Sequence, residues 1–250
     1  MNDSSSDLLA RRMRELALRA HHSGKPQFTA FLEPPEEIAA RTAANDAGTH
    51  VAFFGGFPEA ERRIAGFSDD PIDEAEFPIA CLLLKWNAKF SAPEHRDLLS
   101  ALMGLGIERD SAGDVAFGED DGTAYLFVRE EISDYIRANL ESAGRAPLTA
   151  QVIRDAPRMR PPTGVTVRVT VLSERMDAIL AEGLNLSRAQ AQRLIAQGLV
   201  KRNHVVELRG DLHLTEGDLL SVRGYGRMRV QALDGITRKG RQSVRLFKYT

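Results

Sequence analysis

The chain has 250 residues, a formal net charge of −2, and a composition that is 43% hydrophobic and 27% charged. These values are typical of a soluble globular protein with one to three domains. No apolar run approaches the roughly 18 residues of a membrane-spanning helix, and the polar, acidic N-terminus does not resemble a secretory signal. The single cysteine, Cys81, fits a reducing compartment, so we expect a cytoplasmic protein without a membrane partner.

The charge is distributed unevenly along the chain. Residues 165–250 contain 15 Lys and Arg and 8 Asp and Glu, a net of +7, whereas residues 1–164 have a net of −9. Such an asymmetry favours nucleic-acid binding by the C-terminal part. The alternative is that the basic groups are spread over all faces, because a phosphate-binding site needs clustering as well as net charge.

Two turn-rich linkers divide the chain. Residues 66–74 are acidic, and residues 156–164 contain three prolines, which exclude a regular helix or a central strand. We therefore expect an α+β protein of three parts. These are an N-terminal mixed helical α/β domain (1–73), a central ferredoxin-like domain (74–157) and a C-terminal RNA-binding domain (163–250).

The first part is expected to fold as helix, helix, strand, helix. A basic amphipathic helix is indicated over residues 8–20, and Thr29 is a candidate cap for a second helix, with a first helical turn at Pro34–Glu37. The apolar run Val51–Phe54 indicates a buried strand, and Pro58–Arg63 the start of a short helix. A strand, a glycine turn and a helix can cradle a phosphate, but the dinucleotide fingerprint and the P-loop lysine are both missing. We expect no cofactor.

The middle part has the order β-α-β-β-α-β. Strands and helices are expected, in turn, at residues 78–86, 94–105, 115–117, 123–128, 132–140 and 148–153. This order is typical of a ferredoxin-like sheet, which is the scaffold of many RNA-recognition modules.

The third strand of this sheet partly resembles the corresponding strand of the RNA-recognition motif (RRM). Alternation puts Tyr125 and Phe127 on one face of the strand and Ala124, Leu126 and Val128 on the other. If the second set packs on the helices, Tyr125 and Phe127 are candidates for stacking on RNA bases. The alternative is that a neighbouring domain covers their face of the sheet.

The third part carries the clearest candidate site. Ser187 can cap a helix that begins at Arg188, and Gly198 can end it in a left-handed conformation. Arg188 and Gln192 share a helix face, with Arg193 beside them, and arginine suits RNA because its planar fork pairs with phosphate and stacks on bases. The expected RNA contacts are Arg175, Ser187, Arg188, Gln192, Arg193, Lys201, Arg202, Asn203, Arg223, Arg227 and Arg229.

Residues 174–230 resemble the S4 domain, the αL RNA-binding module of a ribosomal protein and of several RNA enzymes. The motifs that match are Arg175-x-Asp177, Ser187-Arg188, Gly198-x-Val200, Asn203, Gly217-Asp218 and Val222-Arg223-Gly224. Two positions depart from the usual pattern, because Met176 replaces a leucine and Arg202-Asn203-His204 replaces Val-Asn-Gly.

The whole chain resembles the YlmH family of bacterial RNA-binding proteins. The matching motifs are Phe28-Thr29-x-Phe31-Leu32-x-Pro34, Gly55-Gly56-Phe57-x-x-Ala60-Glu61-Arg62-Arg63, the run from His95 to Asp110, and Gly113-Asp114. The resemblance implies an N-terminal domain, an RRM-like domain and an S4 domain. It also implies binding of rRNA and tRNA on the large ribosomal subunit, and the rescue of stalled subunits that carry peptidyl-tRNA. Family gene neighbourhoods raise a cell-division scaffold as an alternative.

An RNA-modifying enzyme is the other alternative, since S4 domains often accompany catalysts. The segment Arg109–Gly113 is a faint match to the catalytic motif of pseudouridine synthases, but it lacks the leucine and precedes the S4-like part. The signatures of tyrosyl-tRNA synthetases are absent, and one cysteine with six scattered histidines gives no zinc spacing. We therefore expect no catalytic residue and no metal, and a monomer that acts by binding RNA.

Overall fold

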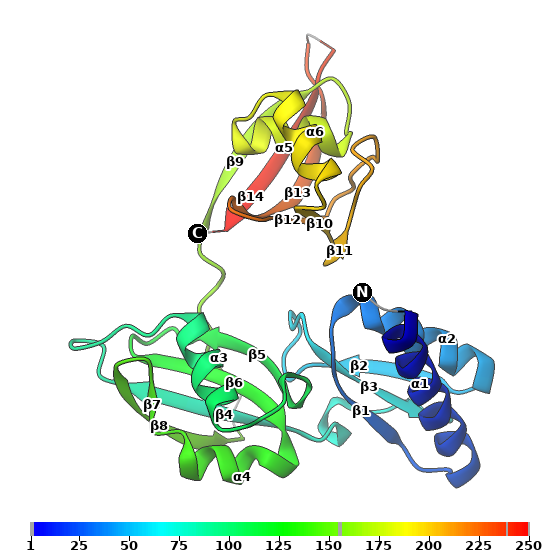
Figure 1. The fold of residues 1–250 in the computed structure, drawn as a ribbon, viewed down its shortest axis with the longest axis vertical. Helices are drawn as coiled ribbons and strands as arrows, with labels where there is room; N and C mark the ends of the chain where they lie inside the picture. The colour runs from blue at the N-terminus through cyan, green and yellow to red at the C-terminus, as the bar shows by residue number, and fades with distance from the viewer. Residues whose placement is uncertain (1–2, 155–156, 239, 250) are drawn as a thin grey trace. The chain divides into compact units, whose positions relative to one another are not determined.

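The computed structural model describes residues 3–154, 157–238 and 240–249. The chain forms two compact units, residues 1–160 and 161–250. The first unit contains two sheets and the second unit one sheet (Figure 1). The protein is thus α+β, as the sequence predicts, while the division into three domains stays a prediction. Within the described residues, no helix is both long and apolar enough to cross a membrane.

The N-terminal part is a three-stranded antiparallel sheet with two helices. In chain order its elements are α1 (Asp3–Ser23), β1 (Gln27–Leu32), η1 (Pro34–Glu36), α2 (Glu37–Ala47), β2 (His50–Phe54) and β3 (Arg63–Ser68). The strands pair in the order β1-β3-β2. Both helices pack on one face of this sheet, where small residues such as Ala17, Ala40 and Ala44 let them come close to Phe67.

Two expectations for this part are wrong. Thr29 does not cap a helix. It lies in β1, where its buried hydroxyl donates to Ala30 O (2.6 Å) and accepts from Ala65 N (2.9 Å). The helix expected at residues 58–63 does not form: residues 58–59 make a turn, residues 61–62 a bend, and β3 begins at Arg63. The short apolar run at residues 28–32 fits helix and strand equally well, and the backbone pairing of β1 with β3 decides for strand.

The central part has the expected β-α-β-β-α-β order. It consists of η2 (Glu74–Glu76), β4 (Ile79–Trp86), α3 (His95–Gly104), η3 (Arg109–Ser111), β5 (Ala112–Phe117), β6 (Thr123–Arg129), α4 (Glu130–Asn139), β7 (Ser142–Ala143) and β8 (Ala146–Ile153). The sheet order β5-β6-β4-β8-β7 is that of a ferredoxin-like sheet with β7 added at one edge. Helices α3 and α4 pack on the face that carries Ala124, Leu126 and Val128.

The N-terminal part covers the opposite face of the central sheet. Only 9% of Tyr125 and 1% of Phe127 is exposed, and both belong to one buried cluster with Phe31, Ile64 and Phe77. Of the two arrangements that the sequence left open, the structure therefore has the one in which another part of the chain covers this face of the sheet. Tyr125 and Phe127 contribute to a core here and are not available for base stacking.

A buried arginine strengthens this junction. Arg62 donates hydrogen bonds to Phe31 O (3.0 Å) in β1 and to Ala112 O (3.2 Å) in β5, so one side chain ties the two sheets together. Close by, Asp114 accepts from the backbone N–H groups of Glu61 and Arg62. Burial raises the pKa of Asp114 despite these hydrogen bonds.

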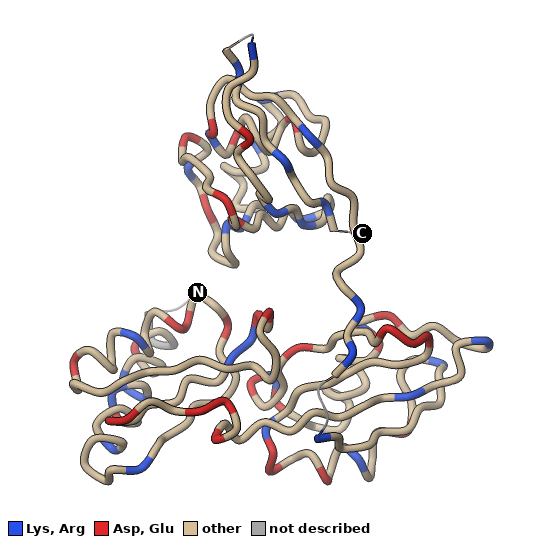
Figure 2. The backbone as a smooth tube through the Cα atoms, turned by 180° about the vertical axis from the view of Figure 1, so that it is seen from behind, with Lys and Arg blue, Asp and Glu red and all other residues tan. Residues whose placement is uncertain are grey.

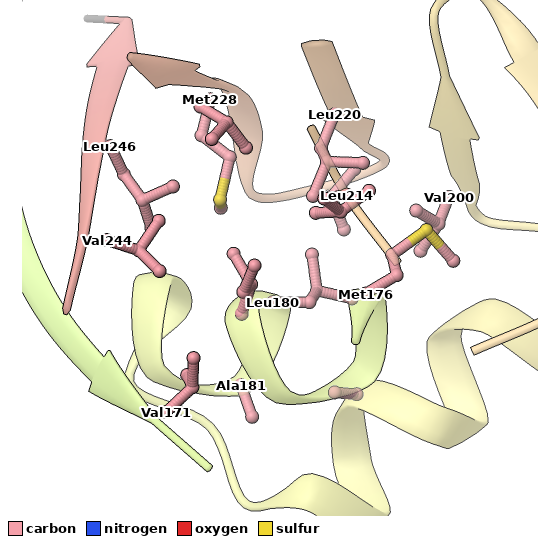
Figure 3. Packing of buried hydrophobic residues seen from close by; sticks show 14 of the residues in the cluster. Val171, Met176, Leu180, Ala181, Val200, Leu214, Leu220, Met228, Val244 and Leu246 are labelled. Atoms are coloured by element: carbon pink, nitrogen blue, oxygen red, sulfur yellow. The ribbon is translucent and has the colours of Figure 1, made fainter. Parts of the chain in front are cut away.

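The second unit is one six-stranded antiparallel sheet with two short helices. Its elements are β9 (Gly164–Val171), α5 (Met176–Leu184), α6 (Arg188–Ala196), β10 (Val200–Arg202), β11 (Val205–Val206), β12 (Leu219–Val222), β13 (Gly226–Ile236) and β14 (Gln242–Tyr249). The strand order is β11-β10-β12-β13-β14-β9. Both helices lie on one face of the sheet. Figure 3 shows Leu180 of α5 pointing towards Met228, and Met176 of the same helix extending towards Val200.

Candidate nucleic-acid interface

Local sequence fixes both ends of α6, the helix that carries Arg188, Gln192 and Arg193 of the expected RNA contacts. The Ser187 hydroxyl accepts a hydrogen bond from Gln190 N (3.2 Å), and the Gln190 side chain accepts one from Ser187 N (2.8 Å). This is a capping box. At the other end, Gly198 has a φ of +68° and turns the chain into β10. Arg188 thus stands at a helix N-terminus, where the backbone N–H groups favour an anion.

Three of the expected contact residues converge on one buried carboxylate, that of Asp177 in α5. Arg175 donates to its two oxygens at 3.1 and 3.0 Å, and Arg188 at 3.2 Å to each. Gln192, one turn after Arg188, adds a bond of 2.9 Å. The Asp177 side chain is fully buried, but that of Arg175 is 34% exposed and that of Arg188 50%. Each guanidinium therefore keeps part of its surface in solvent.

The arginines determine the charge state of Asp177. Burial alone would raise its pKa, but hydrogen bonds from Arg175, Gln192 and Arg188 outweigh burial and hold the pKa well below its usual range. The carboxylate stays ionised, so it holds the two guanidinium groups in place and leaves the cluster with one net positive charge. Sequence reasoning included Asp177 in a motif but missed this role. In the sequence, the spacing could have indicated this role, because Asp177 lies two residues after Arg175 and eleven residues before Arg188.

A second buried carboxylate, Asp218, organises the turn after β10. Arg202 donates to both of its oxygens at 3.1 and 2.9 Å, and Asn203 donates at 2.7 Å. Asn203 and His204 both have positive φ, as a two-residue hairpin turn requires. Burial would raise the pKa of Asp218, but hydrogen bonds, first of all from Arg202, lower it overall. Arg202 and Asn203 thus form a second polar group on this unit.

The remaining expected contacts are not in these two clusters. Arg193 is exposed on α6, and Arg223 is exposed in the turn between β12 and β13. Lys201, Arg227 and Arg229 alternate with the buried residues of β10 and β13, so they point away from the helices. The structure therefore separates the expected residues onto the two faces of one sheet.

The described residues offer neither a metal-ligand cluster nor an activated thiol beside these clusters. Within the part of the chain that the structure describes, no group of three His, Cys, Asp or Glu side chains is placed to hold a metal ion. Burial raises the pKa of the Cys81 thiol to about 12, which keeps it protonated and a poor nucleophile.

A helix pair whose second helix is capped by Ser187, a tight turn, and arginines held by buried carboxylates define an RNA-binding protein of the S4 type. Comparisons with known proteins agree, because residues 174–220 match the S4 domain and residues 72–155 match the putative RNA-binding domain in YlmH. The chain is 34% identical over 221 residues to the ribosome-associated protein quality control protein P2 of Bacillus subtilis (strain 168). The aligned region covers 87% of this chain and 85% of that protein. The chain belongs to the YlmH family of S4-domain RNA-binding proteins.

One solved structure supports the fold. The cell division protein ylmH from Streptococcus pneumoniae matches with a TM-score of 0.51 at 19% sequence identity. The match covers 62% of this chain and 94% of that one. At this level of identity, the match supports the fold alone.

Proposed function

We propose that this protein is a non-catalytic RNA-binding factor that acts on the ribosome in the cytoplasm. In this proposal it binds rRNA or tRNA on the large subunit and assists the rescue of stalled subunits that carry peptidyl-tRNA. The observation that carries the proposal is the pair of arginines fixed on Asp177 within the S4 domain. The name of the Bacillus subtilis relative, a ribosome-associated quality control protein, supports the ribosome as the site of action.

The Asp177 cluster suits a folded RNA backbone for a physical reason. A free arginine side chain loses rotamer freedom when it binds a phosphate, and each immobilised side chain costs about 0.5–1.5 kcal/mol. Arg175 and Arg188 are already ordered by Asp177, so they lose little of this freedom on binding. Their exposed N–H groups, together with the N-terminus of α6, offer donors to phosphate oxygens.

The test is RNA affinity as a function of salt, with the full chain and purified large ribosomal subunits. Each phosphate neutralised on a duplex contributes about 0.9 to the slope of log affinity against log salt. We expect Arg188→Ala combined with Arg202→Ala to weaken binding at least tenfold. The slope of log affinity against log salt should become less steep, by about 1.8.

The matched control is Arg209→Ala. Arg209 lies in the same unit, and its side chain is 66% exposed and paired with Asp211. It is in neither cluster, so we expect wild-type affinity and slope. Wild-type binding by the Arg188/Arg202 variant would remove the proposed surface. Failure of the wild-type chain to sediment with large subunits would remove the ribosome as its partner.

A further inference from the structure

The positive charge of the second unit does not lie in its S4 motif. Residues 172–218, which include both helices and nearly all of the S4 match, contain six Lys and Arg and seven Asp and Glu. The flanking segments, 161–171 and 219–250, contain nine Lys and Arg and one acidic residue, Asp234. The excess charge therefore belongs to the strands β9, β13 and β14 and their connections. In Figure 2, basic residues recur along these strands.

Much of this charge lies on one face of the sheet, which we call the open face. It is the face opposite α5 and α6, and it is formed by the residues that alternate with the buried ones of β13, β14 and β9. Two observations place these residues side by side. In the register Arg229 stands opposite Phe247, which stands opposite Thr166. The Thr166 hydroxyl donates to the Gln231 side chain at 3.0 Å across the intervening strand.

Two aromatic rings lie among the basic groups of the open face. Phe247 and Tyr249 are partly exposed on β14 and meet edge to face, with ring centroids 5.0 Å apart and planes at 87°. The guanidinium of Arg227 lies 5.1 Å from the centroid of the Tyr249 ring. This contact orders Tyr249 and puts a cation beside its flat face.

A second group of charges lies further along the same face. Arg168 and Arg245 stand opposite each other in the register of β9 and β14. Both form ion pairs with Asp234, at 3.5 and 2.9 Å. The three residues together keep one net positive charge, and the acidic partner holds both guanidinium groups close to the strands. The open face is thus basic along its length, with the aromatic rings near its middle strand.

We propose that the open face binds single-stranded RNA, and that it does so independently of the Asp177 cluster. Arginines would neutralise phosphates along the strand, and the Phe247–Tyr249 pair would stack on unpaired bases. A duplex hides its base faces, so partly exposed rings on a basic sheet favour an unpaired strand. This inference rests on the proposed function, because it gives the same RNA-binding protein a second RNA site.

The two sites lie on opposite faces of one sheet, so one RNA need not displace the other. The helix face presents fixed arginines and a helix N-terminus, which suit the backbone of a folded RNA. The open face presents rings and arginines in rows along antiparallel strands, which suit an extended strand. A protein built in this way can hold a folded element and an adjoining unpaired segment together.

The experiment measures fluorescence anisotropy of a labelled, unstructured uridine oligonucleotide with the full chain. We expect Arg227→Gln combined with Arg229→Gln to weaken binding at least tenfold. The slope of log affinity against log salt should become less steep by about 1.4, since each neutralised phosphate on a single strand contributes about 0.7 to its steepness. Tyr249→Leu should weaken binding about fivefold or more, because one base loses its stacking partner, and should leave the slope unchanged. Circular dichroism establishes that each variant is folded.

The matched control is Arg137→Gln combined with Arg209→Gln. Both residues are exposed and paired with nearby aspartates, and neither belongs to either RNA site. We expect wild-type oligonucleotide binding from this control. A loss of binding by the Arg227/Arg229 variant alone, with Tyr249→Leu unaffected, would overturn the stacking site and leave a surface for polyanions in general, including acidic proteins.

The outcomes separate this proposal from the function on which it rests. If the open-face variants bind the oligonucleotide as the wild type does, while Arg188→Ala with Arg202→Ala loses large-subunit binding, the second site is refuted and the proposed function stands. If the wild-type chain binds no large subunits but the open-face variants still lose the oligonucleotide, the ribosomal function is refuted and the site stands. Addition of the large subunit to a chain saturated with oligonucleotide should leave the oligonucleotide bound.

Discussion

The central sheet and the C-terminal sheet each carry a pair of aromatic residues on the face opposite their helices, but only one pair is accessible. Tyr125 and Phe127 are 9% and 1% exposed beneath the N-terminal part of the chain. Phe247 and Tyr249 are partly exposed and lie beside arginines. The comparison shows that strand alternation predicts which residues share a face, whereas elements elsewhere in the chain decide what covers it.

The neighbouring strands carry the signal that distinguishes the two faces. In the central sheet, Ile79, Cys81 and Leu83 of β4 stand on the same face as Phe127 and are all apolar. A strand that is apolar on both sides is typical of burial on both faces. In the C-terminal sheet, the corresponding residues of β13 are Arg227, Arg229 and Gln231, which is the pattern of a face in contact with water.

The largest expected effect comes from the covered face. Phe127→Ala removes a large, fully buried side chain that meets Phe57 at a ring-centroid distance of 4.9 Å. We expect the free energy of unfolding of residues 1–160 to fall by about 3–5 kcal/mol, measured by urea denaturation. RNA affinity of the folded variant should stay at the wild-type value. A loss below about 1 kcal/mol together with weaker RNA binding would show that this face is open in solution.

A smaller effect is expected from the carboxylate that organises the helix face. The pKa of Asp177 is depressed in the folded chain relative to about 3.9 in the unfolded chain. Its hydrogen bonds therefore stabilise the second unit fully above that value, and the stabilisation is lost as pH falls through about 4 towards the folded pKa. Asp177→Asn should lower stability at neutral pH by about 2 kcal/mol, and should flatten the loss of stability on acidification.

Hydrogen exchange of the α5 and α6 amides, followed from neutral to acidic pH, measures this effect locally. Arg175 and Arg188 lose their anchor in the variant, so large-subunit affinity should fall as well. Oligonucleotide binding at the open face should not change. An Asp177→Asn protein with wild-type exchange rates at neutral pH would show that the two arginines are ordered by other contacts.

The parts of the fold that sequence predicted correctly are those with local determinants. Ser187 caps α6 and Gly198 ends it, and the β-α-β-β-α-β order of the central part follows from its apolar periodicity. In the N-terminal part, β2 was predicted from its apolar run, but β1 and β3 were missed because their evidence is not local. From its neighbours in the sequence, Thr29 resembles a helix cap. Its hydroxyl instead accepts a hydrogen bond from the N–H group of Ala65, which is 36 residues later in the chain.

The same distinction holds for the candidate site. The residue types and the capped helix could be predicted, because arginine and a helix N-terminus have fixed chemical preferences. The partition of the arginines could not. Arg188 and Arg202 appeared to belong to one surface, but each is bound to a different buried aspartate. Lys201, one residue before Arg202, points to the other face of the sheet because β10 alternates.

The smallest expected effect on stability comes from the accessible pair. Tyr249 lies partly exposed on β14, and leucine keeps most of its apolar contact. Tyr249→Leu should therefore change the free energy of unfolding by no more than about 0.5 kcal/mol, measured by urea denaturation under the same conditions as Phe127→Ala. A loss above about 2 kcal/mol would mean that the open face is part of a core. A small loss of stability together with weak oligonucleotide binding would be the reverse of the result expected for Phe127→Ala. That contrast would follow if one aromatic pair serves packing and the other, as proposed, binds RNA.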